Sequence, residues 1–128
     1  MRTFSFGSDA GRHITRFGSD FTMSRLVHTE DLHVGCMRFD PGGRVGYHPA
    51  TTYQLFAVVE GSGWVRVGES ERVPIAAGEA AYWEPGEGHE AGTETGMVAI
   101  VVEGDALKGD SEALGPIGFR ARDEGQSP

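Results

Sequence analysis

Short apolar segments alternate with glycine-rich turns along most of this chain. Seven segments of five to eight residues have the β-branched, aromatic or alternating composition of β-strands: 21–27, 34–39, 53–60, 63–67, 71–75, 80–84 and 96–103. Gly and Pro separate them, as at Pro41-Gly42-Gly43 and Gly61-Ser62-Gly63. No stretch has a helical period with caps at both ends. The pattern predicts an all-β protein, either a sandwich or a barrel.

The length and glycine content agree with one β-domain. A chain of 128 residues has room for a single core. Its 20 glycines are about twice the usual share, as many tight turns require. We expect an N-terminal segment at 1–20, a barrel at 21–103 and a polar C-terminal tail at 104–128.

The charge argues against several partners. There are 19 acidic residues and 11 Lys and Arg, a net charge of −8 that repels nucleic acid and anionic lipid. The longest apolar run, 97–102, is too short to span a membrane, and residues 1–13 contain no secretion signal. We expect a cytoplasmic protein without nucleic-acid or membrane partners. Cys36 is the only cysteine, and its strand-like surroundings predict a buried, inert thiol.

Two glycine-bounded motifs each place a histidine on a predicted strand. The first motif runs Gly42, five residues, His48, one residue, Ala50, three residues, Gln54, six residues, Gly61. The second runs Gly78, five residues, Glu84, Pro85, Gly86, two residues, His89, three residues, Thr93. The two histidines are 41 residues apart.

These spacings resemble the two motifs of the cupin superfamily, G-x5-H-x-H-x3-E-x6-G and G-x5-P-x-G-x2-H-x3-N. Every interval matches. The resemblance implies a single-domain cupin-type β-barrel (jelly roll), in which an N-terminal segment often pairs with a second subunit to form a homodimer. The chemical positions depart from the family at four places: Ala50 for the second histidine, Gln54 for the glutamate, Glu84 for the proline and Thr93 for the asparagine.

The resemblance also implies a metal site with His48, His89 and Gln54 as candidate ligands. Metal-binding cupins use three His and one Glu, a set that suits Fe, Mn, Ni or Zn. The neutral amide of Gln54 is a poorer donor than a carboxylate, so we expect weak affinity. Glu84 could replace the missing ligand, although a solvated acid is the ordinary outcome at a turn. Alternatively, the two histidines form only hydrogen bonds and bind no metal.

A small-molecule pocket is expected beside the histidines. If the strand runs unbroken, one face carries the alternate residues His48, Ala50, Thr52, Gln54, Phe56 and Val58. Phe56 and Tyr82 are the predicted pocket residues. Tyr82 and Trp83 cannot both face inward, and the Tyr82 hydroxyl would have a use in a pocket.

Two functions remain open. One is a metal-dependent enzyme acting on a small organic molecule, with its catalytic residues and reaction unidentified because the fold does not select a chemistry. The other is a binding or sensing module that has lost its metal.

A short echo occurs near the N-terminus, where Phe6-Gly7-Ser8-Asp9 is repeated as Phe17-Gly18-Ser19-Asp20. It is too brief for a repeat architecture. We interpret it as coincidence or as paired turns.

Overall fold

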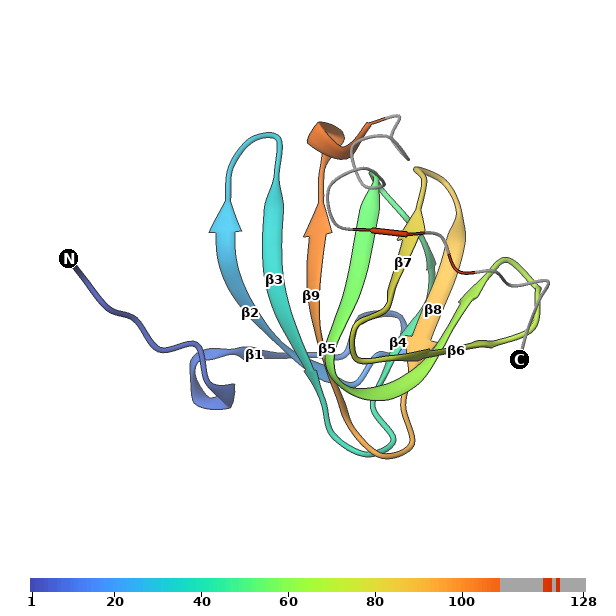
Figure 1. The fold of residues 1–128 in the computed structure, drawn as a ribbon, viewed down its shortest axis with the longest axis horizontal. Coiled ribbons are helices and arrows are strands. Elements are labelled where there is room, and N and C mark those ends of the chain that lie inside the picture. Colours follow the sequence, from blue (N-terminus) through green and yellow to red (C-terminus); the bar gives the residue numbers. More distant parts are fainter. Residues whose placement is uncertain (109–118, 121, 123–128) are drawn as a thin grey trace.

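The computed structural model describes residues 1–108, 119, 120 and 122, and it forms a curled antiparallel β-structure (Figure 1). The strands are β1 (Arg12–Ile14), β2 (Phe21–His28), β3 (His33–Phe39), β4 (Arg44–Pro49), β5 (Gln54–Val67), β6 (Val73–Ala76), β7 (Ala80–Trp83), β8 (Gly88–Gly92) and β9 (Met97–Glu103). The only helices described are the 3₁₀ turns η1 (Ser8–Ala10), η2 (Arg16–Gly18) and η3 (Asp105–Leu107). Within this part of the chain no helix has the length and apolar character needed to cross a membrane.

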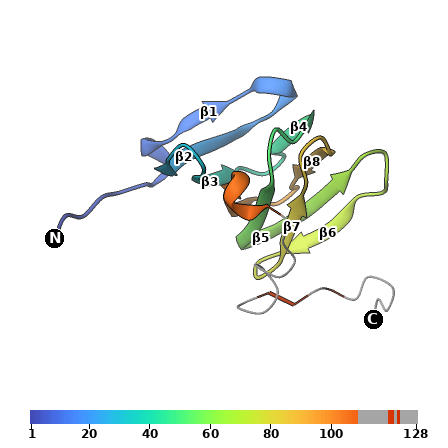
Figure 2. The same cartoon turned by 90° about the horizontal axis from the view of Figure 1, so that it is seen from above.

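Strand β5 joins the two halves of the barrel. The strand order is β1-β2-β3-β9-β5-β8-β4, and β6 and β7 also pair with β5. The first part of β5 pairs with β7 and β9, and its second part pairs with β6 and β8. The sheet therefore curls around β5, as the view from above shows (Figure 2).

A bend inside β5 makes this double pairing possible. A β-bulge shifts the register against β9 between Val58 and Glu60, and Gly61 follows with a φ of 77°. A Cβ at Gly61 would overlap the Gly96 carbonyl, so glycine is required there. The predicted turn at Gly61-Ser62-Gly63 is thus wrong, because the glycines bend a continuing strand.

The core lies on the concave face of the curled sheet. Register places Phe56 beside Val101 and Val58 beside Ala99, and these four side chains are at most 3% exposed. Aromatic rings fill the space between the strands: Phe56 lies 6.1 Å from Phe39 and 6.1 Å from Trp83, centroid to centroid. The prediction of an all-β barrel is confirmed.

The predicted strands have counterparts whose ends differ by one or two residues, apart from the joined 53–60 and 63–67. Strands β4 and β8, which carry the motif histidines, lie outside the seven predicted segments. Strand β1 was also missed, because Arg12-His13-Ile14 has one apolar side chain, and it lies within the expected N-terminal segment 1–20. Of the expected tail 104–128, residues 109–118, 121 and 123–128 lie outside the described residues. Cys36 is 1% exposed, as expected for an inert thiol.

The position of Phe56 yields a stability prediction. Phe56→Ala should lower the free energy of unfolding by about 3–5 kcal/mol, because a 1% exposed ring leaves a cavity among other rings. Urea unfolding measures the change. The matched control is Val59→Ala on the same strand, where the side chain is 54% exposed and the cost should stay below about 0.5 kcal/mol. Equal costs for the two variants would contradict this account of the core.

Candidate functional site

The two motif histidines lie directly opposite each other on neighbouring strands. His48 of β4 pairs with His89 of β8, after a bulge that shifts the register between Val45 and His48. The imidazole centroids are 4.5 Å apart and their planes are tilted by 53°. His89 is 1% exposed and His48 is half-buried. The structure therefore brings together the residues that the two motifs singled out.

Both imidazoles are fixed through Nδ1. His48 Nδ1 lies 2.8 Å from the Gly46 carbonyl oxygen, and His89 Nδ1 lies 3.2 Å from that of Glu87. A carbonyl can only accept, so in the neutral rings the proton is on Nδ1 and the Nε2 lone pair is free. His89 Nε2 is buried and has no hydrogen-bond partner in the described structure. A buried acceptor without a partner is uncommon and calls for an explanation, such as a bound ion or water molecule.

Aromatic rings hold the histidine pair on both sides. Trp83 stacks on His89 with centroids 4.3 Å apart and planes 25° from parallel. On the other side Phe17, from η2, stacks on His48 at 4.8 Å and 4°. The rings thus form the sequence Phe17, His48, His89, Trp83, which has apolar walls at both ends. Sequence reasoning missed the role of Phe17 because η2 is distant from both motifs along the chain.

Gln54 faces the barrel interior without a fixed partner. Its cross-strand neighbours are Trp83 on one side and Glu103 on the other, so the three side chains share one face. Gln54 is 9% exposed, and its amide makes no hydrogen bond to any described residue. Its neighbour Trp83 stacks on His89, and the hydrogen bonds of both imidazoles go to backbone carbonyls rather than to Gln54.

The unbroken strand from His48 to Val58 is not observed. The chain bends at residues 51 and 52, between β4 and β5. Ala50 is 4% exposed, and its backbone is held by the Glu87 carbonyl at 2.9 Å and by the Gly86 N–H at 2.8 Å. Thr52 leaves the expected face and donates to Asp105 at 3.0 Å. The expected alternation of side chains required an extended backbone through residues 50–52, and these hydrogen bonds hold a bend there instead.

Trp83, rather than Tyr82, faces the histidines. The two are consecutive on β7 and point to opposite sides of the sheet. The Tyr82 hydroxyl donates to the Leu107 carbonyl at 2.9 Å, and its ring stacks on Tyr53. The choice of Tyr82 for the inward position is corrected accordingly. Phe56 does face inward, where it contacts Trp83 as part of the core.

Among the described residues, no carboxylate takes the place of the missing ligand. Glu84 is exposed, and its backbone N–H is bound by the Glu87 carboxylate at 2.7 Å. Glu90 pairs with Arg66 on the face opposite His89. The described residues contain no group of three His, Cys, Asp or Glu side chains that could hold a metal ion. In the described part of the chain the candidate donors are therefore the two imidazoles and Gln54, which lies cross-strand from the Trp83 that stacks on His89.

The environment of His89 favours its neutral form. Burial lowers the pKa of His89 below its usual value of 6.5, because the charged ring would lose its hydration. The Glu87 carbonyl raises this pKa, the nearby His48 lowers it, and the net shift is downward. A neutral imidazole with a free Nε2 is the form that binds metal.

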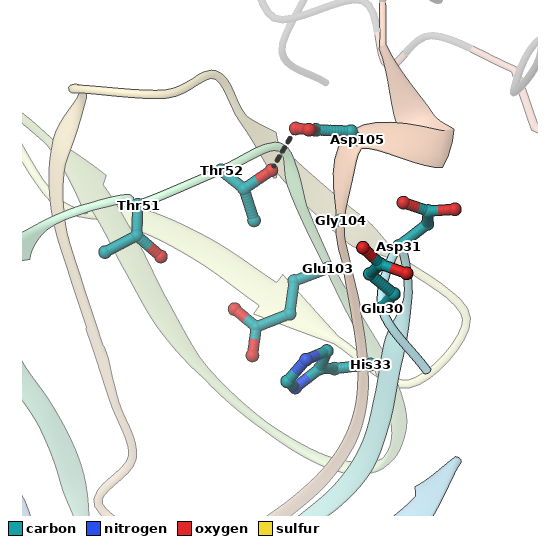
Figure 3. A pocket seen from close by; sticks show the side chains of 8 residues that line it. All are labelled: Glu30, Asp31, His33, Thr51, Thr52, Glu103, Gly104 and Asp105. Atoms are coloured by element: carbon teal, nitrogen blue, oxygen red, sulfur yellow. Dashed lines mark hydrogen bonds between the residues drawn. The ribbon is translucent and has the colours of Figure 1, made fainter. Parts of the chain in front are cut away.

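A separate acidic pocket lies at the end of the barrel near the β2–β3 turn (Figure 3). It has a volume of about 310 Å³ and is lined by Glu30, Asp31, His33, Thr51, Thr52, Glu103, Gly104 and Asp105. His33 also pairs with His28, with ring centroids 4.0 Å apart. Neither motif histidine lines this pocket, and neither do the predicted pocket residues Phe56 and Tyr82.

Comparison with known proteins identifies a family. The sequence profile of the Cupin domain family matches residues 35–104, more than half of the chain. No curated protein matches in sequence.

Three solved structures illustrate the similarity in fold. An RmlC-like cupin from Shewanella frigidimarina is 24% identical, with a TM-score of 0.66 over 89% of this chain and 96% of that one. KdgF from Halomonas sp. is 22% identical, with a TM-score of 0.66 over 80% and 94%. A predicted oxalate decarboxylase from Thermotoga maritima is 22% identical, with a TM-score of 0.65 over 77% and 96%. At sequence identities this low, the comparisons show that the fold is shared and nothing about function.

The lowered pKa of His89 predicts a pH-dependent stability. In the unfolded chain His89 takes up a proton near pH 6.5, whereas in the folded chain it does so only at a lower pH. The free energy of unfolding is therefore unaffected by His89 protonation well above pH 6.5. It decreases as the pH falls toward the folded pKa, by at most about 1.4 kcal/mol per pH unit. His89→Phe, which keeps a ring against Trp83, should therefore show a shallower loss of stability between about pH 7.5 and 5.5.

Urea unfolding in EDTA at several pH values measures the slopes. Above about pH 7.5 the parent and the variant should have the same slope, because the imidazole is neutral in both states. Identical slopes below that pH would show that burial does not affect the protonation of His89.

Proposed function

Because this chain belongs to the cupin family, we propose that it binds one divalent transition metal ion weakly through the Nε2 atoms of His48 and His89, and a small organic molecule beside that ion in the barrel. The observation that carries the proposal is the buried Nε2 of His89, which has no hydrogen-bond partner among the described residues and lies on a ring 4.5 Å, centroid to centroid, from the imidazole of His48. Fe, Mn, Ni and Zn all accept imidazole ligands.

The surroundings of the two rings support this proposal. Metal-binding imidazoles usually donate their other N–H to a carbonyl or carboxylate, as both rings do here through Gly46 and Glu87. Gln54 is the third candidate donor, through its amide oxygen. Because the part of the chain that the structure describes adds no carboxylate or third histidine, the bound ion would keep its full charge and several open positions, and the affinity is expected to be low. Such an ion, held by the two imidazoles, would polarise an oxygen of a bound molecule.

The class of small molecule is open to a short screen. One protein of similar fold is a predicted oxalate decarboxylase, which is a reason to include small organic acids. The rings of Phe17 and Trp83 are a reason to include flat apolar compounds. No reaction is assigned to the chain, since similar folds support many chemistries.

A second candidate is a binding module without metal. The absence of a three-ligand cluster among the described residues favours it, as do the aromatic walls on both sides of the histidine pair. Elemental analysis of the purified protein, before and after incubation with Mn²⁺, Fe²⁺, Ni²⁺ and Zn²⁺, separates the two candidates.

The ligand assignment predicts that His48→Ala with His89→Ala abolishes metal binding, because both imidazole donors are lost. Calorimetry with Ni²⁺ and Zn²⁺ measures it. The matched control is His28→Ala with His33→Ala, which removes another pair of neighbouring imidazoles, 4.0 Å apart. If the control loses metal binding and the motif variant keeps it, the metal is bound by His28 and His33 and the proposal is wrong.

Gln54→Glu should tighten metal binding about ten- to a hundredfold if residue 54 reaches the ion, the range by which ligand-shell changes alter affinity. Without metal the same change should destabilise the protein, because the new carboxylate is buried and lies cross-strand from Glu103. Calorimetry and unfolding in EDTA measure the two effects. Gln54→Ala serves as the control and should give no tightening. Destabilisation without tighter binding would remove residue 54 from the ligand set.

A further inference from the structure

The second copy of the Phe-Gly-Ser-Asp echo packs against the strand that carries His48. Residues 17–20 follow β1 and enter β2 through the turn η2. The Gly18 carbonyl accepts from Arg44 Nε at 2.9 Å, and Asp20 forms two backbone hydrogen bonds with Arg44, at 2.7 and 3.0 Å. Ser19, 7% exposed, accepts the Gly46 backbone N–H at 2.9 Å. The turn is therefore fixed to β4 just before the motif histidine.

Gly46 links this turn to the imidazole. A Cβ at position 46 would overlap the Phe17 carbonyl oxygen, so only glycine lets the turn approach so closely. The carbonyl of Gly46 is also the acceptor for His48 Nδ1, which leaves Nε2 free. Gly46 therefore both allows the turn to pack closely and sets the tautomer of His48.

Phe17 adopts an unusual conformation to reach the same ring. Its φ and ψ are 57° and 27°, the left-handed region, and no other described non-glycine residue has a positive φ. A bulky residue rarely adopts this conformation unless surrounding contacts impose it. The phenyl ring is 56% exposed, yet it lies 4° from parallel to the His48 ring. Burial alone does not explain a strained backbone that holds a half-exposed ring.

The first copy of the echo provides an internal comparison. Phe6 is 46% exposed, and its ring lies 5.7 Å from the Arg38 guanidinium carbon. Its carbonyl accepts from Arg38 at 3.2 Å. It has a negative φ and no ring contact with a histidine among the described residues. The same four residue types contact a motif histidine only in the second copy.

We propose that the Phe17-Gly18-Ser19 turn is a positioning element of the site. Phe17 covers the outer face of His48 and fixes its ring plane, while the turn holds Gly46 so that Nδ1 is bonded and Nε2 faces the ligand. Phe17 is a positioning residue that acts through His48. One consequence rests on the proposed function: loss of the turn should weaken metal binding.

The test uses the full chain labelled with ¹⁵N, with every variant measured at the same pH of about 8. Long-range ¹H–¹⁵N spectra report the ring environment and tautomer of His48 without any metal. Phe17→Asn removes the ring with a residue that tolerates positive φ, and Phe17→Gly does so without backbone strain. Phe17→Tyr keeps the ring, Gly46→Ala displaces the turn, and Phe6→Asn is the matched control.

The His48 ring signals should move in Phe17→Asn and Phe17→Gly and stay in place in Phe17→Tyr and Phe6→Asn. Gly46→Ala should give a mixture of His48 tautomers. Zn²⁺ binding should weaken about tenfold in Phe17→Asn and recover in Phe17→Tyr.

If the His48 signals in Phe17→Asn and Phe17→Gly match those of the parent, the positioning role is refuted. It is equally refuted if the signals move while Zn²⁺ affinity stays at the parent value. If the parent binds no Zn²⁺ but the His48 signals respond as expected, the metal proposal fails and the positioning of His48 by the turn stands.

Discussion

Backbone pairing along β5 is the constraint on which the rest of this structure depends. This strand pairs with β7 and β9 before its bend and with β6 and β8 after it. One continuous segment thereby fixes both halves of the curled sheet, with Gln54 at its start and Phe56 in the core. Because His89 is registered against Val67 near its other end, β5 also determines where the second motif histidine lies.

The histidine site combines polar and apolar requirements between β4 and β8. Each Nδ1 is bonded to a backbone carbonyl, so the rings are held without using Nε2. The aromatic neighbours Phe17 and Trp83 stack on the faces of His48 and His89. This environment disfavours a charged His89, as its lowered pKa shows. An Nε2 atom kept neutral and without a partner is suited to a metal or to a hydrogen-bond donor of a ligand.

Most of the fold could be predicted from the sequence, because alternating apolar residues and glycine turns are local signals. The two cupin-type motifs were informative since their fixed spacing sets where each histidine falls on its strand, and His48 of β4 does lie opposite His89 of β8. Local signals were less reliable where long-range contacts compete with them. The local sequence around Gly61 predicts a turn, but pairing with β9 before it and with β6 after it keeps the strand continuous. The bend at residues 51 and 52 similarly depends on the bond from Thr52 to Asp105.

By itself, then, the sequence determined the class of fold, its family resemblance and the identity of the two histidines, because these depend on spacing and composition. The tertiary structure decided which residues surround them. It placed Trp83 rather than Tyr82 against His89, since one aromatic of a consecutive pair faces inward and packing selects which. It brought Phe17 onto His48 from 31 positions earlier in the chain, a contact that no local pattern encodes because chain folding alone creates it.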